Sequence, residues 1–180
     1  MPGSWSHLTA RFFDVVSARD LDAAERARVS GWLQPGEAAL FLAQSAADQR
    51  HGLTAADRVA SVVAGRSELI RAALLHDVGK RHARLGPIGR VAASLAIRLR
   101  LPLRGRLRAY RDHGPLGAAE LADLGAEPMV VDFTSAHHGS RPDSFDPADW
   151  ALLTEADAAR LPRSPGRGRY PDATMERRPR

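Results

Sequence analysis

Residues 67–80 read SELIRAALLHDVGK, an almost unbroken apolar run that stops abruptly at a histidine and an aspartate. Leucine and alanine favour helix, so the run predicts a buried helix, and Ser67 before Glu68 suits its N-cap. Two polar side chains, His76 and Asp77, then stand at the end of a buried element. Such groups are costly to bury without partners, and metal ions would satisfy both of them.

The chain on either side of this run has the same helical character. Alanine, leucine, arginine and glutamate dominate, β-branched alternation is scarce, and glycines and prolines fall between helical stretches. The pattern predicts helices at roughly 6–17, 20–32, 36–49, 53–63, 67–76, 88–100, 103–111, 114–124, 127–137 and 146–160. We therefore expect an all-α, single-domain helical bundle with a buried metal site.

The 180 residues, 44% of them hydrophobic, are enough for one domain with a real core. We expect an N-terminal helical extension over 1–34 and a main domain over 35–161. The segment 162–180 holds four prolines, two glycines and few apolar residues, so it is expected to be a disordered basic tail.

The absence of cysteine excludes a disulfide scaffold, a thiolate zinc site and a cysteine nucleophile. No apolar run approaches the ~20 residues of a membrane span, and the first residues do not form a secretory signal. The sequence therefore predicts a soluble, cytoplasmic protein.

Five of the seven histidines and two aspartates form a pattern along the chain. They lie in DQRH (48–51), LLHDVGK (74–80), YRDHG (110–114), AHHG (136–139) and, for Asp157, in TEADA (154–158). One histidine near a helix end usually caps the helix or meets solvent, and His7 and His82 are interpreted only in that way. The combined pattern is hard to assemble by chance. Imidazole and carboxylate are metal ligands, which leaves manganese, iron, nickel, zinc and magnesium open.

With LLHDVGK as its anchor, this order resembles the HD superfamily of metal-dependent phosphohydrolases, and in particular its short, single-domain bacterial members. The resemblance covers roughly residues 33–160. It implies an all-α fold with the metals inside the bundle. By resemblance, one ion would be held by His51, His76, Asp77 and Asp157; Asp77 would bridge to a second ion, completed by His113, His137 and His138. All seven positions are filled, so two ions are expected rather than one.

The resemblance also implies a reaction, in which water held between the ions attacks phosphorus in line. Asp77 and Lys80 are the expected catalytic residues. Lys80 would orient the substrate phosphate or stabilise negative charge, or it would serve only as a cation at a helix C-terminus. Arg50 is a weaker candidate for a phosphate contact, with a surface salt bridge as the alternative.

The cyclic-dinucleotide-cleaving branch of the superfamily carries a Glu…Gly-Tyr-Pro signature after its His-His pair. Here the pair at 137–138 runs into GSRPDSF instead, so cyclic di-GMP is not expected as the substrate. A nucleotide monophosphate, an alarmone or a dinucleoside polyphosphate remains open.

The segment 80–111 carries one lysine and nine arginines, and residues 78–111 include no acidic side chain. Its arginines would be solvated or paired with the acidic 112–159 segment, or they would draw a polyanionic substrate toward the metals. Binding of nucleic acid or of an anionic membrane is a further alternative. Two function classes follow: a phosphohydrolase acting on a small phosphorylated substrate, and a non-catalytic metal-binding module that engages an acidic partner.

Overall fold

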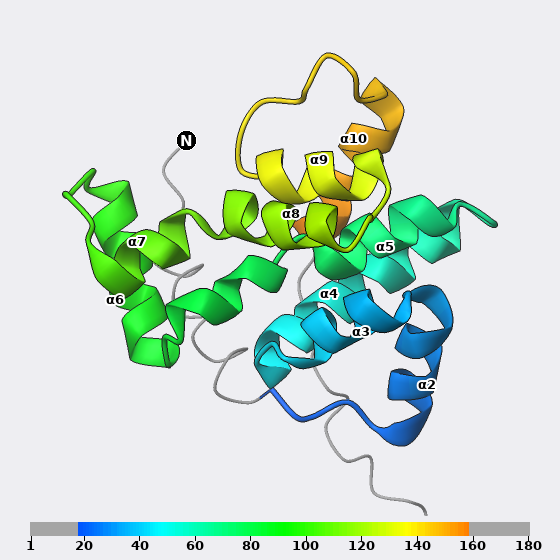
Figure 1. The fold of residues 1–180 in the computed structure, drawn as a ribbon, viewed down its shortest axis with the longest axis horizontal. Coiled ribbons are helices and arrows are strands. Elements are labelled where there is room, and N and C mark those ends of the chain that lie inside the picture. Colours follow the sequence, from blue (N-terminus) through cyan, green and yellow to red (C-terminus); the bar gives the residue numbers. More distant parts are fainter. Residues whose placement is uncertain (1–17, 159–180) are drawn as a thin grey trace, which may run out of the picture.

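The structure, a computed structural model, describes residues 18–158, and that part of the chain contains helices and no strand (Figure 1). The all-α class is thus confirmed. In chain order the elements are α2 (Ala23–Trp32), α3 (Pro35–Leu42), α4 (Ala46–Val62), α5 (Ser67–Leu75), the 3₁₀ helix η1 (Val78–Ala83), α6 (Pro87–Arg98), α7 (Gly105–Arg111), α8 (His113–Asp123), α9 (Pro128–Ala136) and α10 (Pro147–Asp157). Within this range, no helix has both the length and the apolar character that crossing a bilayer requires.

Several helix boundaries follow from local chemistry. Proline occupies the first turn of α3, α9 and α10, where its missing N–H is not needed. The Asp146 side chain accepts hydrogen bonds from the amides of Ala148 and Asp149 at 2.8 and 3.0 Å and so caps α10. Gly125, with φ of 71°, ends α8 in the left-handed conformation that glycine adopts without strain.

Two details of the sequence prediction are wrong. The break expected between 49 and 53 is absent: α4 runs through it, starting after Ser45, whose side chain accepts from the Asp48 amide. Gly52 therefore lies inside a helix. The N-cap of α5 is Arg66 rather than Ser67. The predicted helix at 6–17 and the predicted tail at 162–180 lie outside the described residues.

The apolar helix α5 is at the centre of the fold. Helices α2, α3, α4, α9 and α10 all pack against it, and Leu69, Leu74 and Leu75 are completely buried. Leu21 and Val29, from the described part of the 1–34 segment, belong to the same core. This packing holds the end of α5, with His76 and Asp77, deep inside the bundle.

A buried ion pair fixes α3 on α5. Arg71 is one of the few charged residues in the core, and its guanidinium donates to both carboxylate oxygens of Glu37 at 2.6 and 3.0 Å. The Arg71 guanidinium also donates to the carboxylate of Glu127, which lies toward the surface, at 2.9 Å. The pair thus joins the loop before α9 to α3 through a single side chain of α5.

Arg71→Met should lower the free energy of unfolding by about 3 kcal/mol, because it leaves the Glu37 carboxylate buried without its cation. Chemical denaturation followed by circular dichroism measures this loss. Glu127→Gln is the control and should cost less than about 1 kcal/mol, since half of the Glu127 side chain meets solvent. Equal losses for the two variants would contradict the interpretation.

Candidate metal centre

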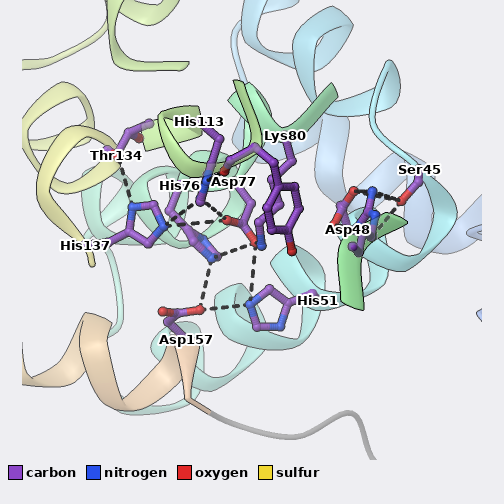
Figure 2. A network of polar contacts seen from close by, with 12 residues as sticks. Ser45, Asp48, His51, His76, Asp77, Lys80, His113, Thr134, His137 and Asp157 are labelled. Carbon is purple, nitrogen blue, oxygen red and sulfur yellow. Dashed lines mark hydrogen bonds and ion pairs between the residues drawn. The ribbon is translucent and has the colours of Figure 1, made fainter. Parts of the chain in front are cut away.

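Three helices of the bundle end at one point, and a fourth helix passes beside it (Figure 2). His76 is the C-cap of α5, His137 is the C-cap of α9, and Asp157 is the last residue of α10. His113 lies there too, at the junction of α7 and α8. His51 comes from the second turn of α4 and is not at a helix end, contrary to the setting expected from the sequence.

Three of the histidines are oriented in the same way. The Nδ1 atoms of His76, His113 and His137 lie 2.9, 2.7 and 2.9 Å from the carbonyl oxygens three residues earlier, those of Ala73, Tyr110 and Thr134. A carbonyl only accepts, so each Nδ1 must carry the proton and donate it. In the neutral form of each ring, Nε2 then has a lone pair that faces the centre, which is the tautomer that binds a metal ion.

Asp77 lies in the middle of these lone pairs and is 2% exposed. Its Oδ1 is 3.1 Å from Nε2 of His113 and 3.6 Å from Nε2 of His137. Its Oδ2 is 3.4 Å from Nε2 of His76 and 3.9 Å from Nε2 of His51. The carboxylate therefore presents one oxygen to each half of the cluster.

Two groups of ligand atoms result, and Asp77 belongs to both. One comprises Asp77, His113, His137 and His138, the other His51, His76 and Asp77, and within each group the ligand atoms lie within 4.8 Å of one another. Asp157 joins the second group, with its Oδ1 at 2.9 Å from Nε2 of His51 and 3.1 Å from Nε2 of His76. The structure thus brings together all seven residues that the sequence suggests as ligands.

These nitrogen and oxygen atoms are arranged to bind a cation rather than to form a hydrogen-bond network. Nε2 of His113 lies 3.3 Å from Nε2 of His137, although both rings carry their proton on Nδ1. Nε2 of His76 and Oδ1 of Asp77 are buried and form no hydrogen bond within the described part of the chain. Lone pairs that converge without a donor repel one another, and a shared metal ion removes the repulsion. The cluster could therefore hold a metal ion.

The pKa values at the centre reflect this concentration of acceptors. Burial alone would lower the pKa of His76, but the carboxylates of Asp77 and Asp157 outweigh it and raise that pKa to about 10. Burial lowers the pKa of His137, where it outweighs the effect of Asp77. Burial lowers the pKa of His138, and the neighbouring rings of His137 and His113 lower it further. His137 and His138 of the first group thus favour the neutral imidazole, while His76 of the second group attracts positive charge.

Glycines next to the ligands allow the helices to approach this closely. A Cβ on Gly79 would lie 1.9 Å from the carbonyl oxygen of His113, so η1 and α8 meet backbone to backbone. A Cβ on Gly52 would lie 2.8 Å from the Leu74 carbonyl oxygen, and one on Gly114 would lie 2.9 Å from that of Thr134. Each contact joins the helix of one ligand to the helix of the next.

This role of the glycines is not predicted from the sequence. A signal is nevertheless present in it, because histidine is followed directly by glycine at 51–52, 113–114 and 138–139. The first of these is predicted to break a helix, but it marks a close contact between α4 and α5.

Lys80 and Arg50, the two cations suggested as phosphate contacts, are placed differently. Nζ of Lys80 is 2.5 Å from Oδ2 of Asp77, at the centre. The Arg50 guanidinium donates to Glu25 and to the carbonyl oxygens of Arg19 and Asp20, and it contacts none of the seven candidate ligands. For Arg50 the salt-bridge alternative is therefore the one that the structure supports.

A second polar group lies one helical turn before His51. The Arg90 guanidinium donates to both oxygens of Asp48 at 2.6 Å and to Ser45 at 3.2 Å, which ties α6 to the start of α4 (Figure 2). An open hollow of about 250 Å³ lies beside it, lined by Ser45, Ala46, Ala47, Leu85, Gly86, Pro87 and Arg90. None of the candidate ligands lines this hollow, so it is distinct from the metal centre.

Comparison of the chain with protein-family models, with curated proteins and with solved structures gives no match.

Proposed function

We propose that this chain is a metal-dependent phosphohydrolase of the HD type, which cleaves a small, nucleotide-like phosphate ester. One observation carries the proposal: the Nε2 atoms of four histidines, from four separate helices or helix junctions, surround the two oxygens of Asp77, a buried carboxylate. A structural site needs only four ligands and closes around its ion. A set of seven ligands that shares one carboxylate is typical of a centre that holds two ions and performs chemistry.

The residues divide into two ligand sets. His51, His76 and Asp157 would hold one ion and His113, His137 and His138 the other, with Asp77 contributing an oxygen to each. Bound there, divalent ions supply an acidified water and neutralise charge on the phosphoryl oxygens. Manganese, iron, nickel, zinc and magnesium are the candidate metals.

The described residues do not fully enclose the centre. His138 is exposed, and His51 and Asp157 keep 22% and 20% of their side chains in contact with solvent. His76 and Asp77, by contrast, are enclosed by the core. A phosphate ester would therefore reach Asp77 past one or more of these three ligands.

Lys80 supplies the chain's own positive charge at this point. Burial acts to lower its pKa, but Asp77 and then Asp48 raise it, so the ammonium stays charged. When the Asp77 oxygens bind metal, this ammonium is free to bind a phosphoryl oxygen. The side chain would orient the substrate and stabilise charge that develops in the transition state.

The test is a hydrolysis screen of metal-reconstituted protein against nucleoside mono-, di- and triphosphates, cyclic nucleotides and dinucleoside polyphosphates. Released phosphate or cleaved product is measured with each candidate metal, and bound metal is quantified by elemental analysis. Metal binding together with hydrolysis of one substrate class is expected. Bound metal without any hydrolysis would favour the non-catalytic module, and failure to bind metal would contradict both alternatives.

Lys80→Met should lower kcat by roughly 10²-fold while the metal content stays unchanged, because it removes one charge-stabilising donor and no ligand. Steady-state kinetics on the substrate found in the screen measures this effect. Arg50→Met is the matched control and should keep kcat within about threefold, since Arg50 is bound to Glu25. A Lys80→Met variant with unchanged kcat would assign Lys80 to stability alone.

A further inference from the structure

An apolar stripe runs along the exposed side of α6. Of the nine large apolar side chains that are exposed in the described part of the chain, five lie between residues 88 and 101. Ile88, Leu95 and Leu99 are spaced by seven and four residues, so they fall on one face of the helix. Ile88 is 78% exposed and Leu99 58%. Ala93, on the other side, is the only buried residue of α6.

The surroundings of the stripe are strongly basic. Five exposed arginines, at 84, 98, 100, 104 and 106, form no ion pair with any residue in the range 18–158. No acidic residue lies between 78 and 111. The acidic 112–159 segment is one expected partner, but of the arginines in the basic segment it pairs only with those at 81, 108 and 111. Of the six arginines between 84 and 106, only Arg90 is therefore paired with a described residue.

The stripe and the unpaired arginines share one lobe. Helices α6 and α7 lie together at the left end of the molecule in Figure 1, on the side opposite α2 and α5. The ion pair between Arg90 and Asp48 fixes α6 on the bundle from its inner side, which turns the apolar stripe outward. The lobe thus presents apolar and positively charged groups on the same projecting surface.

Two of the unpaired arginines occupy backbone positions that do not suit them. Arg84 and Arg100 have φ values of 47° and 53°, in the left-handed region where glycine is favoured. They are the only residues other than glycine with positive φ among those described. Both lie at the lobe, and neither side chain forms an ion pair with another described residue that would explain its presence there.

We infer that the α6–α7 lobe is a docking surface for anionic lipid membranes. A helix with an exposed apolar stripe and flanking arginines inserts its apolar side chains at the lipid interface, while the guanidinium groups bind the anionic headgroups. Nucleic acid would match the arginines but would leave the apolar stripe in water. The combination of both on one projecting helix favours the lipid surface, and this inference is independent of the proposed phosphohydrolase activity.

The test is cosedimentation of the full chain with vesicles of phosphatidylcholine alone and of phosphatidylcholine with about one-third phosphatidylglycerol. We expect binding to the mixed vesicles, little binding to the neutral ones, and release by ~0.5 M salt, which shortens the screening length. Ile88→Ser with Leu99→Ser should weaken binding by roughly tenfold or more. Leu124→Ser with Val62→Ser removes exposed apolar groups elsewhere and should leave binding unchanged.

The double variant Arg84→Gly with Arg100→Gly distinguishes an effect on vesicle binding from an effect on the stability of the fold. Glycine relieves both left-handed positions, so the midpoint of thermal unfolding should hold or rise, while vesicle binding falls by roughly tenfold or more. Arg26→Ala, an exposed arginine on α2, is the control for lost charge and should bind vesicles like the wild type.

Four outcomes would overturn the inference. The first is no binding to anionic vesicles at low salt, and the second is binding that neither pair of variants weakens. The third is a wild-type dimer that Ile88→Ser with Leu99→Ser dissociates, which would make a second copy the occupant. The fourth is a fall of several degrees in the unfolding midpoint of that variant without vesicles, which would place residues 1–17 or another part of the chain on the stripe.

Discussion

Replacement of Asp77 by alanine is expected to remove all bound metal and to lower the proposed phosphohydrolase activity by a factor of roughly 10³ or more. Asp77 is the only residue common to the two ligand groups, and its oxygens face the histidines of both. Among residues 18–158, no neighbouring carboxylate lies in a position to replace it, because Asp157 contacts only the histidines of the second group. Elemental analysis and turnover of the purified variant measure the two effects.

Variants that change a ligand of only one group should lose less metal than Asp77→Ala. His138→Ala should weaken only the first group and His51→Ala only the second, so each should retain part of the metal that Asp77→Ala loses. His82→Ala is the control, since this exposed histidine binds Glu120 and lies outside both groups. If Asp77→Ala keeps its metal, or if His82→Ala loses as much, the centre is not where we place it.

Gly79→Ala should destabilise the fold by at least about 4 kcal/mol, or prevent folding altogether. The added Cβ would lie 1.9 Å from the carbonyl oxygen of His113 and 2.7 Å from the amide nitrogen of Gly117. Both neighbours are backbone atoms that no rotamer change can move, so η1 and α8 would have to separate. Denaturant unfolding measures the loss, and expression in inclusion bodies would be the extreme result.

The matched control is Gly31→Ala, an exposed position of α2 where a Cβ meets nothing within 4 Å. There alanine should be neutral or should stabilise the protein by up to about 1 kcal/mol, in line with its helix propensity. A Gly79→Ala variant as stable as this control would show that η1 and α8 do not pack as described. If the Gly79→Ala variant folds but is less stable, Asp77 and His113 should lie farther apart in it, and its metal affinity should also be lower.

The helical class and the candidate ligands could be predicted because their signals are local. The apolar run at 67–75 predicts a buried helix from composition alone, and α5 is indeed the most enclosed element. The polar pair directly after it must find partners, so the residue order by itself indicates a site at that point of the chain. Prolines and Gly125 mark helix ends by their own backbone restrictions.

What could not be predicted depends on contacts between distant segments. Low helix propensity makes Gly52 a predicted break, whereas its position is decided by the Leu74 carbonyl oxygen of another helix. The role of Arg50 depends on Glu25 and on backbone carbonyls about thirty residues earlier. The outward orientation of the α6 stripe likewise follows from the Asp48–Arg90 pair, which joins residues 42 positions apart.

Because α5, α9 and α10 all end at the centre, their macrodipoles direct three partial negative charges toward it. Most phosphate-binding sites use the opposite arrangement, in which helix N-termini point amide N–H groups at the anion. A phosphate arriving at this end of the bundle would be repelled by the helix termini as well as by Asp77 and Asp157. If the centre acts on a phosphate ester as proposed, its phosphate affinity would come from bound cations and from Lys80, so we expect metal to bind first and the anion second.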